Sequence, residues 1–251
     1  SDLAAVIRGK FEGFNISVTK IIEASDEDIT EYFRFLQNQE RLRAGEILNS
    51  LSDSRMEKYL LKINDTNMFC KIIGFDNERK EFDKLFYNII GVFDNKLSLG
   101  VPDSSINKYV TTTNEIHEGK DGVENLLEQI NKVTEQYKGK IMLIGTKKRY
   151  VKFLMLLMGF KLVDFTIDTE NKLKALEKID NKLSVFFSSK PDVVKQEFYD
   201  YSEDIVEEFR AIALISKGAQ ILERVKNRME ILAYYVENIQ EKNIPSKLPI
   251  K

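Results

Sequence analysis

Helical patterns alternate with short apolar runs between Gly122 and Ser188, and this alternation constrains the fold more than any other feature of the chain. Apolar residues recur at steps of three and four over residues 122–137, 147–158 and 169–182, which predicts three amphipathic helices. Shorter runs at 140–145, 160–167 and 184–188 have the length and composition of strands. Alternation at this pitch predicts βαβ crossovers and a sheet that is at least partly parallel.

The residues before this segment favour further strands. These are predicted at 3–11, 16–23, 59–63, 68–75 and 108–114. Ser25 is predicted to cap a helix, because the next three residues are acidic, as the positive end of a helix dipole prefers. The pattern over residues 78–101 allows a helix or a hairpin of strands 86–93 and 96–101, and we favour the hairpin.

The chain after Pro191 has a helical pattern throughout. Its apolar stripe consists of Ile205, Phe209, Ile212, Ile215, Ala219, Leu222, Val225, Met229, Leu232, Val236 and Ile239. A single helix over the stripe would be about 50 Å long at a rise of 1.5 Å per residue. We therefore expect the helix either to fold back near Gly218 or to pack against a partner.

Together these patterns predict an α/β or α+β protein with a mixed sheet. We expect a mixed domain over residues 1–190, made of a β-rich part (1–114) and an alternating βαβαβ-like part (115–190). A long helix or helical hairpin is expected over 191–242, and a mobile tail over 243–251.

The amino-acid composition limits the classes of function that we expect. Lys and Arg number 38 and Asp and Glu 40, so the net charge is −2, and we do not expect a nucleic-acid partner. The single cysteine, Cys70, excludes an intramolecular disulfide. No apolar run approaches the roughly 18 residues of a membrane span, and no signal-peptide pattern opens the chain. These features predict a soluble cytoplasmic protein without membrane contact.

Catalytic and metal-binding motifs are scarce. His117 is the only histidine, and its acidic neighbours Glu115, Glu118 and Asp121 do not follow a metal-ligand spacing. We interpret His117 as a solvated loop residue, and we predict no metal and no cofactor from any recognised motif.

Two predicted helix starts have the groups needed to bind an anion. The first unpaired amides of a helix carry partial positive charge, and in both places glycines and cations accompany them. The candidate anion-binding residues are Gly119, Lys120 and Gly122 at the first helix and Gly145, Thr146, Lys147, Lys148 and Arg149 at the second. Helix capping by Asp121 and Thr146 is the structural alternative.

Three short segments resemble the GNAT-type acetyltransferases. Residues 21–29 (Ile-Ile-Glu-Ala-Ser-Asp-Glu-Asp-Ile) resemble the opening strand and first helix of that family. Residues 119–127 resemble its pyrophosphate loop and helix, and 154–160 resemble the Gly-Phe step near its C-terminus. The Gln/Arg-x-x-Gly-x-Gly/Ala core of the family's loop is not present.

The resemblance implies specific roles. The amides of residues 120–123 would bind the pyrophosphate of acetyl-CoA, and Tyr150 would be a general acid to the leaving thiolate. Glu115 or Glu118 would be the base for an amine.

Because the residues do not form a recognisable active site, we favour a protein that acts through self-association or a protein partner, using the 205–239 stripe. The alternative is a protein that binds an anionic small molecule or cofactor, with acyl transfer as its most specific form.

Overall fold

The computed structural model describes residues 25, 28–29, 32, 55–140, 147–188, 198–199, 201–215 and 221–238. The chain divides into two compact units, Ser1–Leu42 and Arg43–Lys251. The predicted hairpin over 3–23, the strand over 140–145 beyond Lys140, the Pro191 boundary and the tail lie outside the described residues.

The predicted Ser25 cap is confirmed in the first unit. The Ser25 Oγ accepts a hydrogen bond from the Asp28 amide (3.2 Å), and the Ser25 amide donates to the Asp28 carboxylate (2.9 Å). This reciprocal pair satisfies two amides that a helix start leaves unpaired.

The described residues of the second unit are mostly helical and contain no strand. Its helices are α4 (Glu57–Leu60), α5 (Thr66–Ile72), η1 (Glu78–Lys80), α6 (Glu81–Phe93), α7 (Asp103–Thr112), α8 (Lys120–Gln136), α9 (Lys148–Gly159), α10 (Thr169–Leu183), α11 (Val185–Ser188), α13 (Glu203–Leu214) and α14 (Leu222–Asn238). The predicted mixed α/β sheet is therefore wrong, and the described part of the chain is mostly helical.

The three long helices of the alternating region were predicted correctly as α8, α9 and α10, but the strands predicted over 160–167 and 184–188 are wrong. Residues 160–167 form turns after α9, and 184–188 contain the short helix α11. Gln129 of α8 holds the first of these segments, because its side chain accepts from the Phe165 amide (3.0 Å). A side-chain partner thus replaces the sheet hydrogen bonds that a strand would need.

The predicted strands 59–63, 68–75 and 108–114 are also wrong, since α4, α5 and α7 occupy them. Asp65 caps α5 by accepting from the Met68 amide (2.8 Å), and Gly74 ends the segment in the left-handed region (φ 66°). A capping residue before the run and a glycine after it are helix signals. They outweigh the β-branched residues inside the run.

The hairpin predicted over 86–101 is replaced by the 13-residue helix α6. Every residue of α6 from Phe82 to Phe93 is buried, and the large apolar ones recur at helical spacing: Phe82, Leu85, Phe86, Ile89, Ile90 and Phe93. Asn95 adopts φ 54°, a conformation that suits a hairpin turn and also a helix end. The turn signal was therefore correct, but it ends a helix.

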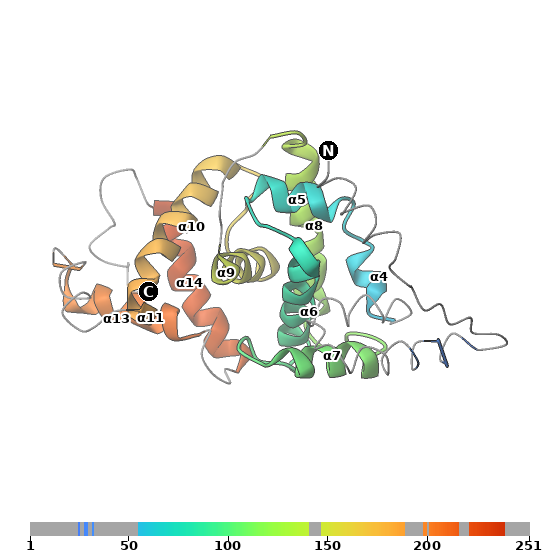
Figure 1. Cartoon of the computed structure of the whole chain (residues 1–251). Helices are drawn as coiled ribbons and strands as arrows, with labels where there is room; N and C mark the ends of the chain where they lie inside the picture. Colours follow the sequence, from blue (N-terminus) through green and yellow to red (C-terminus); the bar gives the residue numbers. More distant parts are fainter. Residues whose placement is uncertain are drawn as a thin grey trace, which may run out of the picture. The chain divides into compact units, whose positions relative to one another are not determined.

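Helix α9 is the centre of the second unit (Figure 1). It contacts α6 and α8 on one side and α10 and α14 on the other. All of its residues from Tyr150 to Gly159 except Lys152 are buried. A helix that is apolar on all sides needs neighbours on all sides, which accounts for this central position.

The C-terminal stripe folds back on itself as two helices, α13 and α14. Glu208 accepts from the Tyr235 hydroxyl, and Arg228 donates to the Ala211 carbonyl oxygen (2.8 Å), so the helices run antiparallel. Phe209, Ile212, Met229 and Leu232 are fully buried. The fold-back alternative is confirmed, and these stripe residues belong to the chain's own core. Within the described part of the chain, no helix could cross a membrane.

Candidate functional site

The glycines at the start of α8 pack closely against the buried residue Phe93. Gly119 has φ +59°, and a Cβ on it would lie 2.3 Å from the Phe93 carbonyl oxygen. A Cβ on Gly122 would lie 2.7 Å from the Phe93 ring, and one on Gly159, at the end of α9, 2.4 Å from it. Each glycine is therefore explained by close packing against Phe93.

Phe93 is the last residue of α6, and its ring also makes an edge-to-face contact with Phe160 at 5.0 Å between centroids. Lys120, the predicted cation of this start, is 67% exposed and lies 3.7 Å from Glu124 on its own helix. An exposed pair of this kind contributes little to stability. Ring packing is thus the main feature of the α8 start.

The start of α9 is instead connected to its neighbours by ion pairs. Arg149 donates to the Asp180 carboxylate and to the Asp180 carbonyl oxygen of α10, both at 2.6 Å. Its guanidinium also lies over the Phe187 ring, 4.5 Å from the centroid. Both charged side chains are buried, with exposed fractions of 14% and 4%. This pair joins α9 to α10 and the helix that follows it.

The neighbouring lysines contact other elements. The Lys148 ammonium lies 2.6 Å from Glu81 of α6, which also pairs with Lys84 at 3.1 Å. Lys152 donates to the Leu99 carbonyl oxygen at 2.6 Å, and Lys147 donates to Asn181 at 3.4 Å. Gly145 and Thr146 lie outside the described residues.

These contacts shift two protonation equilibria. Burial lowers the pKa of the Lys152 ammonium, and the nearby Lys148 charge lowers it further. Burial alone would raise the pKa of Glu81, but its bonds to Lys148 and Lys84 outweigh burial, and the pKa is lowered. The basic run of the sequence is therefore largely engaged in holding α6, the α6–α7 loop and α10 around α9.

Tyr150, the general acid implied by the acetyltransferase resemblance, is 1% exposed. Its hydroxyl has no hydrogen-bond partner, and burial raises the pKa of the phenol well above its ordinary value. The two implied bases also have partners: Glu115 pairs with Lys58 at 3.3 Å, and Glu118 accepts from Asn95. The structure does not bring these three residues together at an open site.

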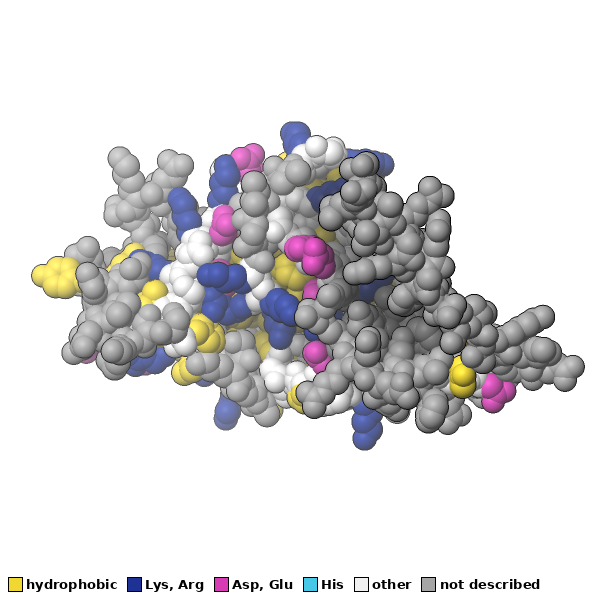
Figure 2. Space-filling view, in the orientation of Figure 1, with side chains coloured by type: hydrophobic (Ala, Val, Ile, Leu, Met, Phe, Trp, Pro, Cys, Tyr) yellow, Lys and Arg dark blue, Asp and Glu magenta, His cyan; other side chains and the backbone are white. Residues whose placement is uncertain are grey.

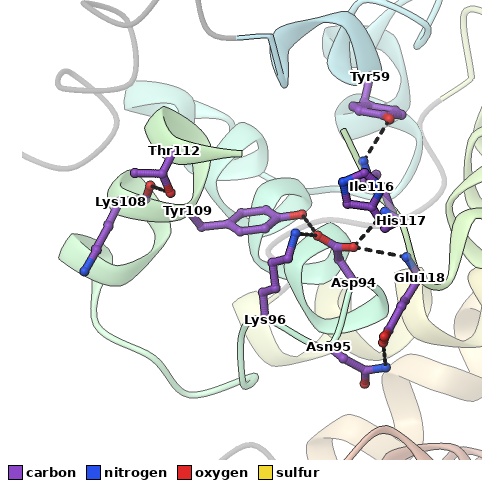
Figure 3. Close-up of polar contacts among 10 residues, drawn as sticks. All are labelled: Tyr59, Asp94, Asn95, Lys96, Lys108, Tyr109, Thr112, Ile116, His117 and Glu118. Carbon is purple, nitrogen blue, oxygen red and sulfur yellow. Dashed lines mark hydrogen bonds and ion pairs between the residues drawn. The ribbon is translucent and has the colours of Figure 1, made fainter. Parts of the chain in front are cut away.

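A second polar cluster surrounds Asp94 at the end of α6 (Figure 3). One carboxylate oxygen accepts from the amides of His117 (3.0 Å) and Glu118 (3.3 Å). The other accepts from the Tyr109 hydroxyl of α7 (3.2 Å) and lies 2.8 Å from the Lys96 ammonium. One buried carboxylate thereby joins α6, α7 and the loop that leads into α8.

Burial alone would raise the pKa of Asp94, but its bonds with Lys96 and the two amides outweigh burial, and the pKa is lowered. Tyr59 of α4 supports the same loop, since its hydroxyl accepts from the Ile116 amide at 3.3 Å. His117 takes part through its backbone, and the residue is exposed, as a solvated loop histidine should be.

Sequence reasoning missed Asp94 and Phe93 as organising residues. Asp94 looked like a turn residue, and its four partners are separated from it by between 2 and 24 positions in the chain. The available signal was an acidic residue directly after an apolar helical stripe, where a helix end disfavours negative charge. That unfavourable placement indicates that other donors compensate the carboxylate.

Metal and thiol chemistry receive no support from the described residues. Among them, no group of three His, Cys, Asp or Glu side chains could hold a metal ion. Burial raises the pKa of Cys70 to about 12, so its thiol is a poor nucleophile at neutral pH.

Exposed apolar side chains occur near the C-terminal hairpin. Tyr199 is 85% exposed, Leu214 45% and Ile221 60%. Leu214 ends α13 and Ile221 precedes α14, so both lie at the same end of the antiparallel pair.

No protein-family model, curated protein or solved structure matches this chain. The acetyltransferase resemblance therefore rests on short motifs alone. The glycines of two of these motifs, Gly119 and Gly122 in one and Gly159 in the other, pack against Phe93.

Proposed function

We propose that this protein acts through self-association or a protein partner, using the exposed side chains of Leu214 at the end of α13 and Ile221 before α14. The supporting observation is the pair of exposed apolar side chains Leu214 and Ile221 at the same end of two antiparallel helices. Burial of one such side chain contributes about 1.5–3 kcal/mol, so a few of them can support an interface.

This surface differs from the stripe predicted from the sequence. The stripe residues between Ile205 and Val236 that pack in the hairpin are buried by α9, α10 and each other. Charged substitutions at Met229 would therefore unfold the chain instead of separating copies. The proposal rests on residues that remain at the surface of the hairpin.

Sedimentation equilibrium of the full chain tests the self-associating form. We expect a concentration-dependent oligomer that becomes at least about 100-fold weaker in Leu214→Glu/Ile221→Glu, because charges enter an apolar contact. Ile167→Glu is the matched control, since Ile167 is 64% exposed on the loop before α10. A monomer at every concentration, or equal effects of both variants, would contradict self-association through these two side chains.

A second candidate is an anion-binding protein that uses the start of α9. Lys147 occupies the N-cap position before this helix and makes no side-chain cap, so the first amides of the helix have no capping acceptor from it. Lys148 keeps 57% of its side chain exposed beside Glu81. These two features favour a small anion such as pyrophosphate, and the last prediction of the Discussion tests it.

A further inference from the structure

Lys152 of α9 is a half-buried lysine that has no carboxylate partner among the described residues. Its Nζ donates to the Leu99 carbonyl oxygen at 2.6 Å, which is a neutral acceptor. The neighbouring lysines differ in this respect, since Lys84 lies 3.1 Å and Lys148 2.6 Å from the Glu81 carboxylate. Lys152 is therefore the cation of this group that lacks direct compensation.

The charges around Lys152 do not balance while it is protonated. The group consists of the ammonium groups of Lys84, Lys148 and Lys152 and the carboxylates of Glu81 and Asp103, the second of which lies 3.2 Å from Lys84. Three positive and two negative charges leave an excess of one positive charge. Because a partly buried charge without a partner is costly, a change that makes Lys152 neutral would balance the group.

The same surroundings favour the unprotonated form of the Lys152 amine. Burial and the charges of Lys148 and Lys84 lower the pKa of its ammonium, whereas Asp103 acts in the opposite direction. The unprotonated amine is the form that attacks a carbonyl carbon.

Lys152 also lies next to the surface. Lys148, one turn earlier on α9, keeps 57% of its side chain exposed, and Asp103 keeps 52%. Figure 2 shows basic and acidic side chains interspersed over the near end of α9. A small reagent therefore has a short approach to the amine.

We propose that Lys152 is a modification site that accepts an acetyl group from a thioester. The unprotonated nitrogen attacks the thioester carbonyl carbon, so that a C–N bond forms and the C–S bond breaks. The leaving thiolate takes up the proton that the nitrogen loses. The product is a neutral amide, which balances the two remaining ammonium groups against the two carboxylates.

The hydrogen bond of Lys152 distinguishes this modification from condensation with an aldehyde. An acetylated lysine keeps one N–H, which can donate to the Leu99 carbonyl oxygen as the amine does. The nitrogen of a neutral imine has no hydrogen and would leave that oxygen without its donor. The contact with Leu99 thus favours an amide.

Acetylation of the full chain by acetyl-CoA at neutral pH, with no added enzyme, tests the proposal. Peptide mass spectrometry at low total modification gives the rate at each lysine. Lys152 should react at least about threefold faster than Lys178, an exposed lysine of α10, because more of its amine is unprotonated. An equal or slower rate at Lys152 would overturn the proposal.

Lys148→Gln tests the electrostatic cause of this reactivity. It removes a neighbouring positive charge and a partner of Glu81, so the rate at Lys152 should fall at least about twofold. Lys226→Gln is the matched control, because it removes the same charge from an exposed position on α14. Unchanged thermal unfolding midpoints show that both variants are folded. A decrease confined to Lys148→Gln supports the proposal, whereas no decrease, or the same decrease in both variants, contradicts it.

Discussion

The starts of α8 and α9 look alike in sequence but have different neighbours in the structure. Each combines lysines with glycine, or with a glycine just before it, at the start of a helix. At α8, Gly119 packs against the Phe93 carbonyl group and Gly122 against the Phe93 ring, and neither place has room for a Cβ. At α9, Arg149 and Lys148 are bonded to carboxylates of α10 and α6.

This difference shows that a helix start rich in glycine and lysine can have at least three structural or functional roles. It can bind an anion, allow an aromatic ring to approach closely, or anchor neighbouring helices by ion pairs. The local sequence has the same appearance in each case, because the deciding group lies far away in the chain. Phe93 is 26 positions before Gly119, and Asp180 is 31 positions after Arg149.

The largest effect is expected at the buried ion pair of α9. Arg149→Met should reduce the free energy of unfolding by about 3–5 kcal/mol, because Asp180 remains buried without its partner. The double variant Arg149→Met/Asp180→Leu should recover most of this loss, since neither charge remains. Urea unfolding measures both variants, and a double variant no more stable than the single one would contradict the assignment.

The next effect is expected at the α8 start. Gly119→Ala should reduce the free energy of unfolding by about 2–4 kcal/mol, from left-handed backbone strain together with overpacking on Phe93. Gly139→Ala is the matched control, because Gly139 also has positive φ (+83°) but no atom within 4 Å of a built Cβ. Its loss should be about 1–2 kcal/mol. Equal losses of unfolding free energy in the two variants, measured by chemical denaturation, would show that close packing against Phe93 does not account for the glycine at position 119.

A smaller, pH-dependent effect is expected at Asp94, which fixes the loop before α8. Its folded pKa is lowered, so its stabilisation is present above the unfolded pKa of about 3.9 and is lost as the pH falls through the folded pKa. Asp94→Asn should lower the free energy of unfolding by about 1–2 kcal/mol at pH 7 and flatten its decline in acid.

The control for this measurement is Asp103→Asn, since Asp103 is 52% exposed and pairs with Lys84 at 3.2 Å. We expect its loss to stay below about 1 kcal/mol, with little change in the acid limb of the stability curve. If Asp103→Asn flattened the curve as much as Asp94→Asn, the acid sensitivity would not belong to the Asp94 cluster.

The smallest effect on stability is expected for the outward lysines of the two starts. Lys147→Gln/Lys148→Gln and Lys120→Gln should each change the free energy of unfolding by no more than about 1 kcal/mol. If the α9 start binds an anion, saturating pyrophosphate at 100 times Kd adds about 2.7 kcal/mol to wild type. Differential scanning fluorimetry should then show this shift abolished in the α9 variant and kept in Lys120→Gln. Absence of a shift in wild type would remove the second candidate function.

The helices α8, α9 and α10 and the Ser25 cap could be predicted because their signals are local and repeated. Apolar residues recur over three or more turns of each helix, and Ser25 directly precedes an acidic first turn. The caps expected at Asp121 and Thr146 are not the N-cap residues of α8 and α9, which are Gly119 and Lys147. The runs at 68–75 and 160–167 contain too few residues to distinguish a strand from a buried helix or a pinned turn. The structure that these two runs adopt depends on Asp65, which caps α5, and on Gln129, which accepts from the Phe165 amide. These two contacts are visible only in the structure.

In the candidate site, too, local features could be predicted from the sequence and distant contacts could not. The residues Lys147, Lys148 and Arg149 were correctly placed at a helix start, but their partners were not predictable, because Glu81 and Asp180 come from other helices. Which face of α10 is covered became known only from its packing.

The sequence pattern is sufficient to predict the long amphipathic helices and the positions of their starts. It also predicts the fold-back of the C-terminal stripe as one of two alternatives. It could do so because periodicity and capping act between residues at most a few positions apart. Three features depend on the tertiary structure: the central position of α9, the packing of Phe93 against Gly119, Gly122 and Gly159, and the contacts by which Arg149 and Asp94 join separate helices. Those outcomes depend on close packing and on charge burial between distant parts of the chain, where shape complementarity and desolvation outweigh local preference.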